Sequence, residues 1–452
     1  MSTEPLYTAD EMRAAEARHP GYPDTIPELM ERAGGAATEV ALSLWPDARR
    51  WTLVCGGGSN GGDGRVVARR LEEAGREARI VDAKAGETDL GDPDVVVDAL
   101  FGTGFSGEPR PDAAALIEAM NASGAPVFAI DLPSGVDAST GEVAGAAVRA
   151  TATVTFHGAK LGLGVAPGRF HAGDVHVADI GLEPAETGAR LVTEAILDEV
   201  PRRSSGQNKY SAGHVLVVGG SRGMTGAPSL SARAALRADA GYVTIAAPAE
   251  SLPVLETLVV EAVKRPLEQV FEATAKADAL AVGPGLGRDP EAKELVRRLL
   301  AEVAVPAVVD ADALFELEPG DWPAPRVLTP HEGELARLLG RESKDVAAHR
   351  LAAVREAAER FRCVVVLKGE DTLVAAAGGD VLVVALGLPS LATAGTGDVL
   401  TGIAAAFLAK GLEPQRAAAA AAAAQQLAAR AAPQRSGLVA SDVVEALPRV
   451  LG

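Results

Sequence analysis

The chain has 452 residues, of which 48% are hydrophobic and 23% are charged, and its formal net charge at pH 7 is -18. A chain of this length exceeds one ordinary hydrophobic core, so we expect about two or three domains. The acidic balance argues against binding to nucleic acid or to an anionic membrane, because both need a basic surface. Any anionic ligand must therefore be held by a local site.

The N-terminus and the cysteines indicate the cellular setting. The first residues carry acidic side chains where an export signal has a basic start and an apolar core, and no run of roughly 18 apolar residues occurs. Cys55 and Cys363 are too few for a disulfide framework or a cysteine-based metal site. We expect a cytoplasmic protein with small-molecule ligands, and we also expect a homo-oligomer.

The first half of the chain alternates β-branched runs with helical patterns. Strands are predicted at residues 51–55, 78–83, 94–100, 126–132 and 152–156, and helices at residues 64–75 and 112–124. This alternation predicts a largely parallel sheet with helices on both faces, the arrangement of an α/β domain.

The second half repeats this pattern after a polar stretch at residues 201–213. That stretch is rich in serine, glycine and charge and lacks apolar periodicity, so we predict a linker and two domains, residues 1–200 and 207–452. Strands are expected at residues 214–220, 242–248, 279–285, 306–311, 326–330 and 363–369, with helices at residues 289–303 and 349–361. The alanine tract from residue 417 to residue 424 predicts a closely packed helix.

A glycine cluster near the C-terminus, AGTGDVLTG, opens a predicted helix. Gly395 and Gly397 allow a sharp turn that directs several backbone N–H groups at one spot, which is an anion site. Asp398 beside this nest is the candidate base that accepts a proton from a hydroxyl. The alternative is a glycine-rich helix start in which Asp398 only favours the helix dipole.

Four other segments follow predicted strands and carry glycine, acid, His or Lys: residues 282–289, 308–314, 328–334 and 366–374. In open α/β sheets the ligand crevice lies at the carboxyl ends of the strands. The sequences of these segments and their order along the chain resemble those of the ribokinase-like fold. With KYSAGHVLVVGG from residue 209, they resemble most closely the ADP- or ATP-dependent NAD(P)H-hydrate dehydratases. The resemblance runs from about Gln207 to the end of the chain.

This resemblance implies ligand contacts, with Mg²⁺ accompanying ADP or ATP. Contacts to the hydrated nicotinamide nucleotide fall on Ala227, Gly285, His331 and Asp398; contacts to the adenine nucleotide fall on Lys368, Gly369, Glu370, Asp371, Thr372 and Gly397. An isolated His331 would instead be satisfied by a backbone carbonyl, and Lys368 would be a solvated charge. Asp310 and Asp312 either support Mg²⁺ indirectly or cap the next helix, so we leave them out of the site. Leu388 precedes Pro389 where many members have Asn-Pro.

A second glycine cluster, CGGGSNGGDG from Cys55 to Gly64, also lies between a predicted strand and a predicted helix. This pattern allows a nucleotide or phosphate to approach the backbone. Two later strand ends add polar side chains, so that Asn60, Asp98 and Ser134 offer only hard oxygen ligands. Such a donor set favours an alkali or alkaline-earth cation over a transition metal.

With residues 29–42 and 155–163, these segments resemble the NAD(P)H-hydrate epimerase domain, which has a Rossmann-like sheet, over about Leu6 to Pro184. The resemblance implies K⁺ at Asn60, Asp98 and Ser134. It implies substrate contacts at Ser59, Asn60, Gly61, Gly62, Asp63, Gly102, Thr103, Gly104, Phe105, Ser106, Gly107, Glu108 and Asp131. Ser59 stands where the family has a second asparagine. Asp131 is the expected proton-handling or hydroxyl-orienting acid, and Lys160 is a weaker candidate whose alternative is a solvated loop lysine.

The two resemblances together predict repair of hydrated NADH or NADPH. The N-terminal domain would interconvert the R and S epimers, and the C-terminal domain would dehydrate the S epimer at the expense of ADP or ATP. One alternative is a hydroxymethylpyrimidine- or pyridoxal-type kinase fused to a nucleotide-binding module, which would release a stable phosphorylated product. Another makes the N-terminal domain a binding or scaffolding module, against which Asn60 and the segments at residues 98–104 and 131–135 argue.

Overall fold

The computed structural model describes residues 1–202, 212–434 and 436–452. The chain divides into two compact units: residues 5–189 form one, and residues 1–4 with residues 190–452 form the other. Residues 203–211 of the predicted linker lie outside the described residues.

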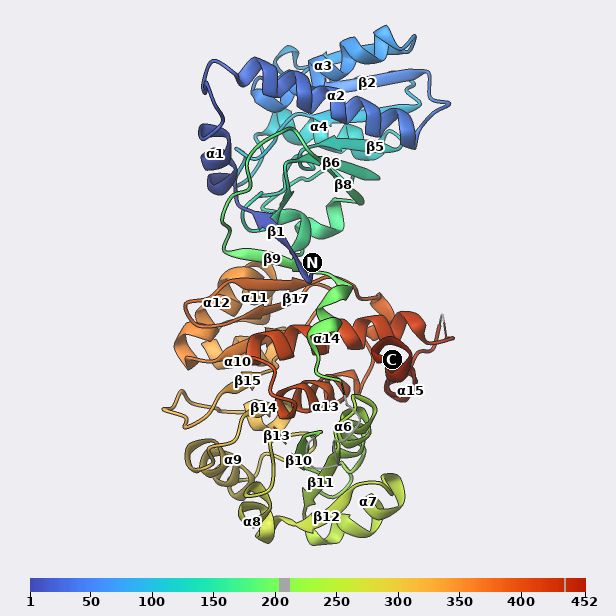
Figure 1. Cartoon of the computed structure of the whole chain (residues 1–452). Coiled ribbons are helices and arrows are strands. Elements are labelled where there is room, and N and C mark those ends of the chain that lie inside the picture. The colour runs from blue at the N-terminus through green and yellow to red at the C-terminus, as the bar shows by residue number, and fades with distance from the viewer. Residues whose placement is uncertain (203–211, 435) are drawn as a thin grey trace. The chain divides into compact units, whose positions relative to one another are not determined.

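The N-terminal unit contains a six-stranded, entirely parallel sheet (Figure 1). Its order is β3 (Glu77–Asp82), β2 (Arg50–Cys55), β4 (Val95–Ala99), β5 (Val127–Ile130), β6 (Ala152–Phe156) and β8 (Asp174–Ala178). Five of these strands fall on the predicted segments, and β8 was not predicted. Because all the strands run the same way, their carboxyl ends meet at one edge of the sheet.

Helices cover both faces of this sheet, as predicted. Helices α2 (Ile26–Leu44) and α3 (Ser59–Glu73) share one buried cluster with the sheet, and α4 (Pro111–Ala122) shares another with the opposite face. The helices α2 and α3 pack closely because Gly34 lacks a side chain, and a Cβ there would lie 2.4 Å from Val66 Cγ1. This packing fixes the start of α3, which carries the glycine cluster.

The C-terminal unit contains a mixed sheet. Its parallel part is ordered β12 (Val263–Pro266), β11 (Tyr242–Ala247), β10 (His214–Val218), β13 (Ala279–Val282), β14 (Ala307–Val309), β15 (Arg326–Leu328) and β16 (Val364–Leu367). The strands β17 (Thr372–Ala375) and β18 (Val381–Val384) then continue antiparallel. The six predicted strands are all present, but β12 and the hairpin of β17 and β18 were not predicted.

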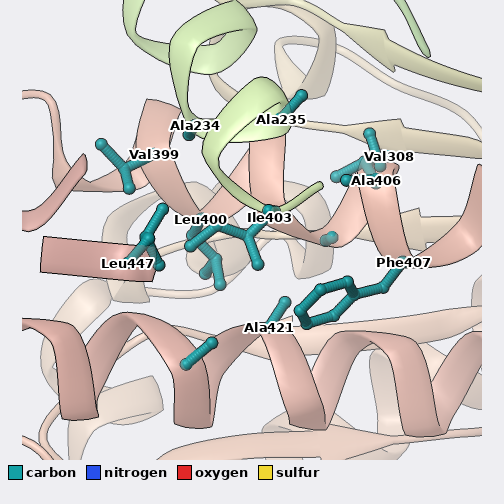
Figure 2. Packing of buried hydrophobic residues seen from close by; sticks show 14 of the residues in the cluster. Ala234, Ala235, Val308, Val399, Leu400, Ile403, Ala406, Phe407, Ala421 and Leu447 are labelled. Atoms are coloured by element: carbon teal, nitrogen blue, oxygen red, sulfur yellow. The ribbon is translucent and has the colours of Figure 1, made fainter. Parts of the chain in front are cut away.

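Two buried helices form the centre of this unit. Helices α13 (Thr396–Ala409) and α14 (Pro414–Ala431) pack against each other and share one core with α6 (Gly226–Arg237) and α15 (Ala440–Leu451). The alanine tract is entirely buried within α14, which confirms the closely packed helix. Figure 2 shows the side chain of Phe407 on α13 lying beside Ala421 of α14. Helix α12 (Arg350–Phe361) packs against β16 and β17 outside this cluster, so the sheet is again covered on both faces.

The remaining elements are short. In the N-terminal unit they are α1 (Ala9–Ala17), β7 (Ala159–Lys160), α5 (Leu161–Gly164), and the 3-10 helices η1 (Ala83–Ala85) and η2 (Gly168–His171); β1 (Thr3–Tyr7) pairs with β7 at Leu6 and Tyr7. The others are β9 (Ala189–Val192), η3 (Glu194–Glu199), η4 (Ala249–Ser251), α7 (Leu252–Leu258), η5 (Leu267–Gln269), α8 (Val270–Thr274), α9 (Pro290–Glu302), η6 (Ala311–Leu314), α10 (Glu332–Leu339), α11 (Ser343–Ala348) and η7 (Pro389–Leu391). Within the described ranges, none of the helices combines the length and apolar character needed to span a bilayer.

The contact between α13 and α6 leads to a stability prediction. A Cβ on Gly402 would lie 2.1 Å from the carbonyl oxygen of Ser231. Gly402→Ala should therefore destabilise the unit by about 1–3 kcal/mol through overpacking, although alanine normally favours a helix. Chemical denaturation would measure this, with Gly226→Ala as the control, because a Cβ at Gly226 meets nothing within 4 Å. Equal stability of the two variants would contradict this packing.

Candidate functional sites

The C-terminal unit gathers charged groups where its parallel strands end. Asp310 follows β14 and Lys368 follows β16, and the Lys368 Nζ atom lies 2.9 Å from the Asp310 Oδ1 atom. The other carboxylate oxygen of Asp310 accepts a hydrogen bond of 2.8 Å from the Thr401 hydroxyl on α13. A Cβ on Gly397 would lie 3.4 Å from the Lys368 Nζ atom. The predicted lysine and the predicted glycine nest therefore meet, with the buried Asp310 between them.

Ion pairing decides the charge state of this pair. Burial alone would raise the pKa of Asp310, but the ammonium of Lys368 and hydrogen bonds hold that pKa below its usual value. Burial would lower the pKa of Lys368, and the carboxylates of Asp310 and Glu334 raise it instead. Lys368 is therefore a fixed positive charge, which contradicts the alternative of a solvated lysine.

Asp398 lies in the first turn of α13. The helix begins after Gly395, which has a φ of 88°, a left-handed conformation that suits glycine. The first N–H groups of any helix have no acceptor within it, so those of Gly397 and Asp398 are available to an anion. Burial, and then the charge of Asp310, raises the pKa of Asp398 to about 7, while Lys368 opposes this rise. A carboxyl that titrates near neutral pH suits a general base.

His331 caps α10 rather than meeting a carbonyl. Its Nδ1 atom accepts a hydrogen bond of 3.0 Å from the Gly333 N–H, and the backbone N–H of His331 donates to Glu334 Oε2 at 2.8 Å. The alternative, in which the ring only donates a hydrogen bond to a backbone carbonyl, is therefore wrong. Because Nδ1 is an acceptor, Nε2 carries the ring hydrogen in the neutral form; this atom lies 3.5 Å from Glu334 Oε1, and the ring is half-exposed. The predicted substrate contact remains a prediction.

The side chain of Arg350 holds the loop from Lys368 to Thr372 in place. This buried guanidinium lies 3.0 Å from the Asp371 carboxylate and also pairs with Glu332. A Cβ on Gly369 would lie 2.4 Å from Arg350 Nη2, so any larger residue there would displace the guanidinium from its carboxylate partners. The Thr372 hydroxyl bonds to the Gly369 carbonyl at 2.9 Å. Asp371 and Thr372 are buried and hold the loop through these contacts, whereas Glu370 is partly exposed.

Ala227, in the first turn of α6, and Gly285, in the loop after β13, lie next to each other. Gly285 adopts a φ of 61°, and a Cβ there would lie 3.3 Å from the Cβ of Ala227. The Gly285 carbonyl accepts hydrogen bonds from the N–H and the hydroxyl of Ser221, at 2.6 and 2.9 Å. These small residues leave backbone surface that a flat ring can approach closely.

The N-terminal unit brings the three predicted cation ligands together. Asp98 is fully buried and accepts the Ser134 hydroxyl at 2.6 Å and the Ser134 N–H at 2.7 Å. Asn60 donates its side-chain N–H to the Phe101 carbonyl at 2.7 Å, and its Oδ1 atom is buried without a partner. Burial raises the pKa of Asp98 to about 6. An unpartnered amide oxygen close to a buried carboxylate fits a cation with oxygen ligands.

Asp131 and Lys160 form a buried ion pair. The Lys160 Nζ atom lies 2.8 Å from Asp131 Oδ1, and it also donates to the Thr155 hydroxyl and to the Phe156 carbonyl, each at 2.9 Å. The Lys160 side chain is only 1% exposed, so the alternative of a solvated loop lysine is wrong. Asp131 has a φ of 68°, a strained conformation for a residue with a side chain. Its Oδ2 atom accepts the Thr103 N–H at 3.2 Å.

The pKa values of two further carboxyl groups are affected by Asp131. Burial, and then the charge of Asp131, raises the pKa of Asp63 to about 8. The same two causes raise the pKa of Glu16 on α1. At neutral pH Asp63 is therefore a protonated acid and Asp131 is paired with an ammonium. Sequence reasoning did not select Glu16, because nothing in its helical pattern points to a site in the sheet.

The glycine-rich segments allow close approach in this unit. A Cβ on Gly61 would lie 1.9 Å from the Gly56 carbonyl, and one on Gly102 would lie 3.2 Å from both the Asn60 Cβ atom and the Asp131 Oδ2 atom. Gly102 therefore joins the predicted cation ligands to the predicted acid. Ser59 is exposed at the first position of α3. The predicted contacts from Gly102 to Glu108 form the loop after β4, in which Phe105 stacks on Phe101 at 4.7 Å.

Four residues of the C-terminal site were missed or set aside. Asp310 does not cap η6 with its side chain, contrary to one of the alternatives left open for it. Asp312 instead accepts hydrogen bonds from the Gly287 N–H and from Arg288. Thr401 and Glu334 carried no signal in the sequence beyond their closeness to predicted site residues.

Comparison with protein families assigns both units. Residues 215–449 match the family described as NAD(P)H-hydrate dehydratase, and residues 27–89 and 78–162 match the YjeF-related protein N-terminus. The C-terminal unit also resembles a ribokinase-like superfamily protein from Enterococcus faecalis, with 26% identity and a TM-score of 0.53 over 60% of this chain and 97% of that one. The class is thus a two-domain α/β enzyme with a ribokinase-like C-terminal domain.

Full-length relatives define the family. The bifunctional NAD(P)H-hydrate repair enzyme of Moorella thermoacetica is 40% identical, covering 94% of this chain and 92% of the relative. That of Escherichia coli is 34% identical, covering 94% and 90%. The ADP/ATP-dependent NAD(P)H-hydrate dehydratase of Bacillus subtilis, co-crystallised with ATP and Mg²⁺, is 28% identical with a TM-score of 0.53 over 57% of this chain and 96% of that one. The chain belongs to the family of bifunctional NAD(P)H-hydrate repair enzymes.

Proposed function

We propose that the C-terminal unit dehydrates hydrated NADH or NADPH at the nest of α13, with Mg²⁺ and ADP or ATP as co-substrate. Hydroxide is a poor leaving group, and phosphorylation of the ring hydroxyl turns it into a good one. Asp398 takes the hydroxyl proton, while Lys368 and the N–H groups at Gly397 stabilise charge on the transferred phosphoryl group. The C–O bond then breaks and phosphate leaves with the bonding electrons, while the neighbouring ring carbon loses a proton to water, so that the C=C bond of the dihydronicotinamide is restored. The observation that carries this proposal is that Lys368 Nζ lies beside the turn that holds Asp398, so close that a Cβ on Gly397 would lie 3.4 Å from it.

The product distinguishes this reaction from the kinase alternative. Dehydration yields one inorganic phosphate for each dihydronicotinamide restored, whereas a kinase leaves a stable phosphorylated compound. Phosphate release and the dihydronicotinamide absorbance, followed together with the S epimer and ATP, should rise in equal amounts. A phosphorylated product that accumulates would support the kinase instead.

For the N-terminal unit we propose epimerisation at the carbon that bears the hydroxyl. Ring opening and reversible loss of water both need an acid and a base near that carbon. Asp131 is oriented by Lys160 and by the Thr155 hydroxyl, which donates to Asp131 Oδ1 at 3.3 Å, and it handles one proton. The protonated Asp63 is the neighbouring acid. The ring of the substrate would enter between the first turn of α3 and the loop at residues 102–108. The homo-oligomer and the cytoplasmic location stay predictions alongside this proposal.

We further propose that K⁺ binds between Asn60, Asp98 and Ser134. The unpartnered Asn60 Oδ1 atom and the buried Asp98 carboxylate support this assignment. When bound, the cation would supply a fixed positive charge that orients a substrate phosphate or hydroxyl. Asn60 itself lies at the start of α3, so the ion would also hold the glycine cluster in place.

Potassium should therefore stabilise the protein. At ten times the dissociation constant, KCl should add about 1.4 kcal/mol relative to choline chloride of equal ionic strength. Asn60→Ala should lose this difference in thermal unfolding. Asn121→Ala, which removes hydrogen bonds to Ala147 and Arg149 in the same unit, should keep it. An unchanged response in Asn60→Ala would contradict the assignment.

A further inference from the structure

Asp310 connects the two halves of the dehydratase site through a single carboxylate. Its Oδ1 atom lies 2.9 Å from the Lys368 Nζ atom, and its Oδ2 atom accepts the Thr401 hydroxyl at 2.8 Å. Thr401 lies one helical turn beyond Asp398 on α13. The carboxylate therefore joins the end of β16 to the second turn of α13, which follows the turn that carries the nest.

The backbone of Asp310 is itself fixed by the neighbouring strand. Its N–H donates to the Val282 carbonyl of β13 at 3.0 Å. Gly283 has a φ of 118°, and a Cβ there would lie 1.9 Å from the Asp310 carbonyl oxygen. The carboxylate is thus presented from a rigid strand end rather than from a loop, which is what an accurate positioning group needs.

The contacts of Asp310 are more than charge balance in the folded protein requires. A buried carboxylate needs one cation for balance, and a lysine near a phosphate site needs no partner when it can reach solvent. Here the Lys368 side chain is 21% exposed, yet it is held against Asp310 and lies 3.6 Å from Glu334. The ammonium is directed at the nest before any nucleotide arrives.

We propose that Asp310 is a positioning residue for dehydration, which holds the Lys368 ammonium against the nest at Gly397 so that both act on the same phosphoryl group. This inference rests on the proposed function of the C-terminal unit. Asp310 itself touches neither reacting atom. It acts through Lys368 on one side and through Thr401 on the other.

Asp310→Asn is the direct test, because asparagine keeps the shape and removes the charge. We expect kcat for nucleotide-driven dehydration to fall about 10- to 100-fold, the usual cost of losing a supporting partner. The KM for ATP should change much less, since loss of a negative charge near the phosphate offsets looser placement of Lys368. Thr401→Val, which removes only the second anchor, should lower kcat by less than Asp310→Asn.

The pH profile separates positioning from stability. The charged groups that face Asp398 are Asp310, Asp312 and Lys368. Removing the charge of Asp310 leaves Lys368 free to stabilise the Asp398 carboxylate, so the acidic limb of the kcat profile should move to lower pH. Asp239→Asn is the matched control, because Asp239 pairs with the buried Lys410 at 2.9 Å elsewhere in the unit. It should change neither kcat nor the limb.

The outcomes discriminate clearly. A lower kcat together with a shifted acidic limb supports the positioning role. If Asp310→Asn lowers only the unfolding temperature, with kcat and the acidic limb of the pH profile equal to those of the wild type, the positioning role is overturned while the proposed function stands. A wild type without nucleotide-dependent dehydration would overturn both.

Discussion

Asp398→Asn should remove nucleotide-driven dehydration and leave nucleotide binding in place. Asparagine preserves the size of the side chain and the first turn of α13, but it cannot accept the hydroxyl proton. General-base catalysis contributes about 10²- to 10⁴-fold, so a loss of this order is expected in kcat. Initial rates of dihydronicotinamide recovery from the pure S epimer, with calorimetric binding of ATP, would measure both properties.

The pH dependence of the wild type gives the same residue a second test. Because the pKa of Asp398 is raised to about 7, the base form increases with pH across neutrality, and the rate should rise with it. The residual rate of Asp398→Asn should not follow this rise. Asp380→Asn, which changes an exposed carboxylate beyond β17, should behave as the wild type. Full activity in Asp398→Asn would refute the assignment of the base.

Asp131→Asn should abolish epimerisation while sparing dehydration. Asparagine tolerates the left-handed backbone at this position better than alanine, so loss of activity reports on the carboxylate rather than on strain. Removal of the charge also leaves the buried ammonium of Lys160 without its carboxylate. We expect the rate of R to S conversion to fall by about 10²-fold or more.

This rate can be measured by separating the two epimers chromatographically in the absence of nucleotide. Asp174→Asn, an exposed carboxylate on β8, is the control and should retain the wild-type rate. If Asp131→Asn interconverts the epimers normally, the proton-handling role belongs to another group of the cluster, and Asp63 would be the first to examine.

The alternation of strands and helices was readable because buried parallel strands are apolar throughout. The runs at β2, β4, β10 and β13 each have β-branched residues followed by glycine or acid, and all were predicted. The hairpin of β17 and β18 was missed, because both of its strands are buried along their whole length and therefore lack the polar alternation that usually marks antiparallel strands. Because the strands could be predicted, the polar and glycine-rich motifs that follow them could be placed at the carboxyl edge of each sheet, where both sites lie.

The side-chain pairings could not be read in this way. Asp310 and Lys368 are 58 residues apart in the chain, and their contact depends on the order β14, β15, β16 in the sheet. Lys160 lies among small residues typical of a loop, and its burial follows from the partner it finds in Asp131. Glu16 reaches the N-terminal site from a short helix whose pattern only reports its own amphipathic face. Each case depends on tertiary neighbours rather than on local sequence.

The most direct measurement is recovery of dihydronicotinamide absorbance from a mixture of both hydrated NADH epimers, with ATP, Mg²⁺ and K⁺. The wild type should restore the whole pool in one continuous phase. Asp131→Asn should restore the S epimer at the wild-type rate and then slow to the uncatalysed rate of epimerisation. A wild type that stops after the S epimer, or that shows no dependence on nucleotide, would contradict the proposal that two domains complete one repair.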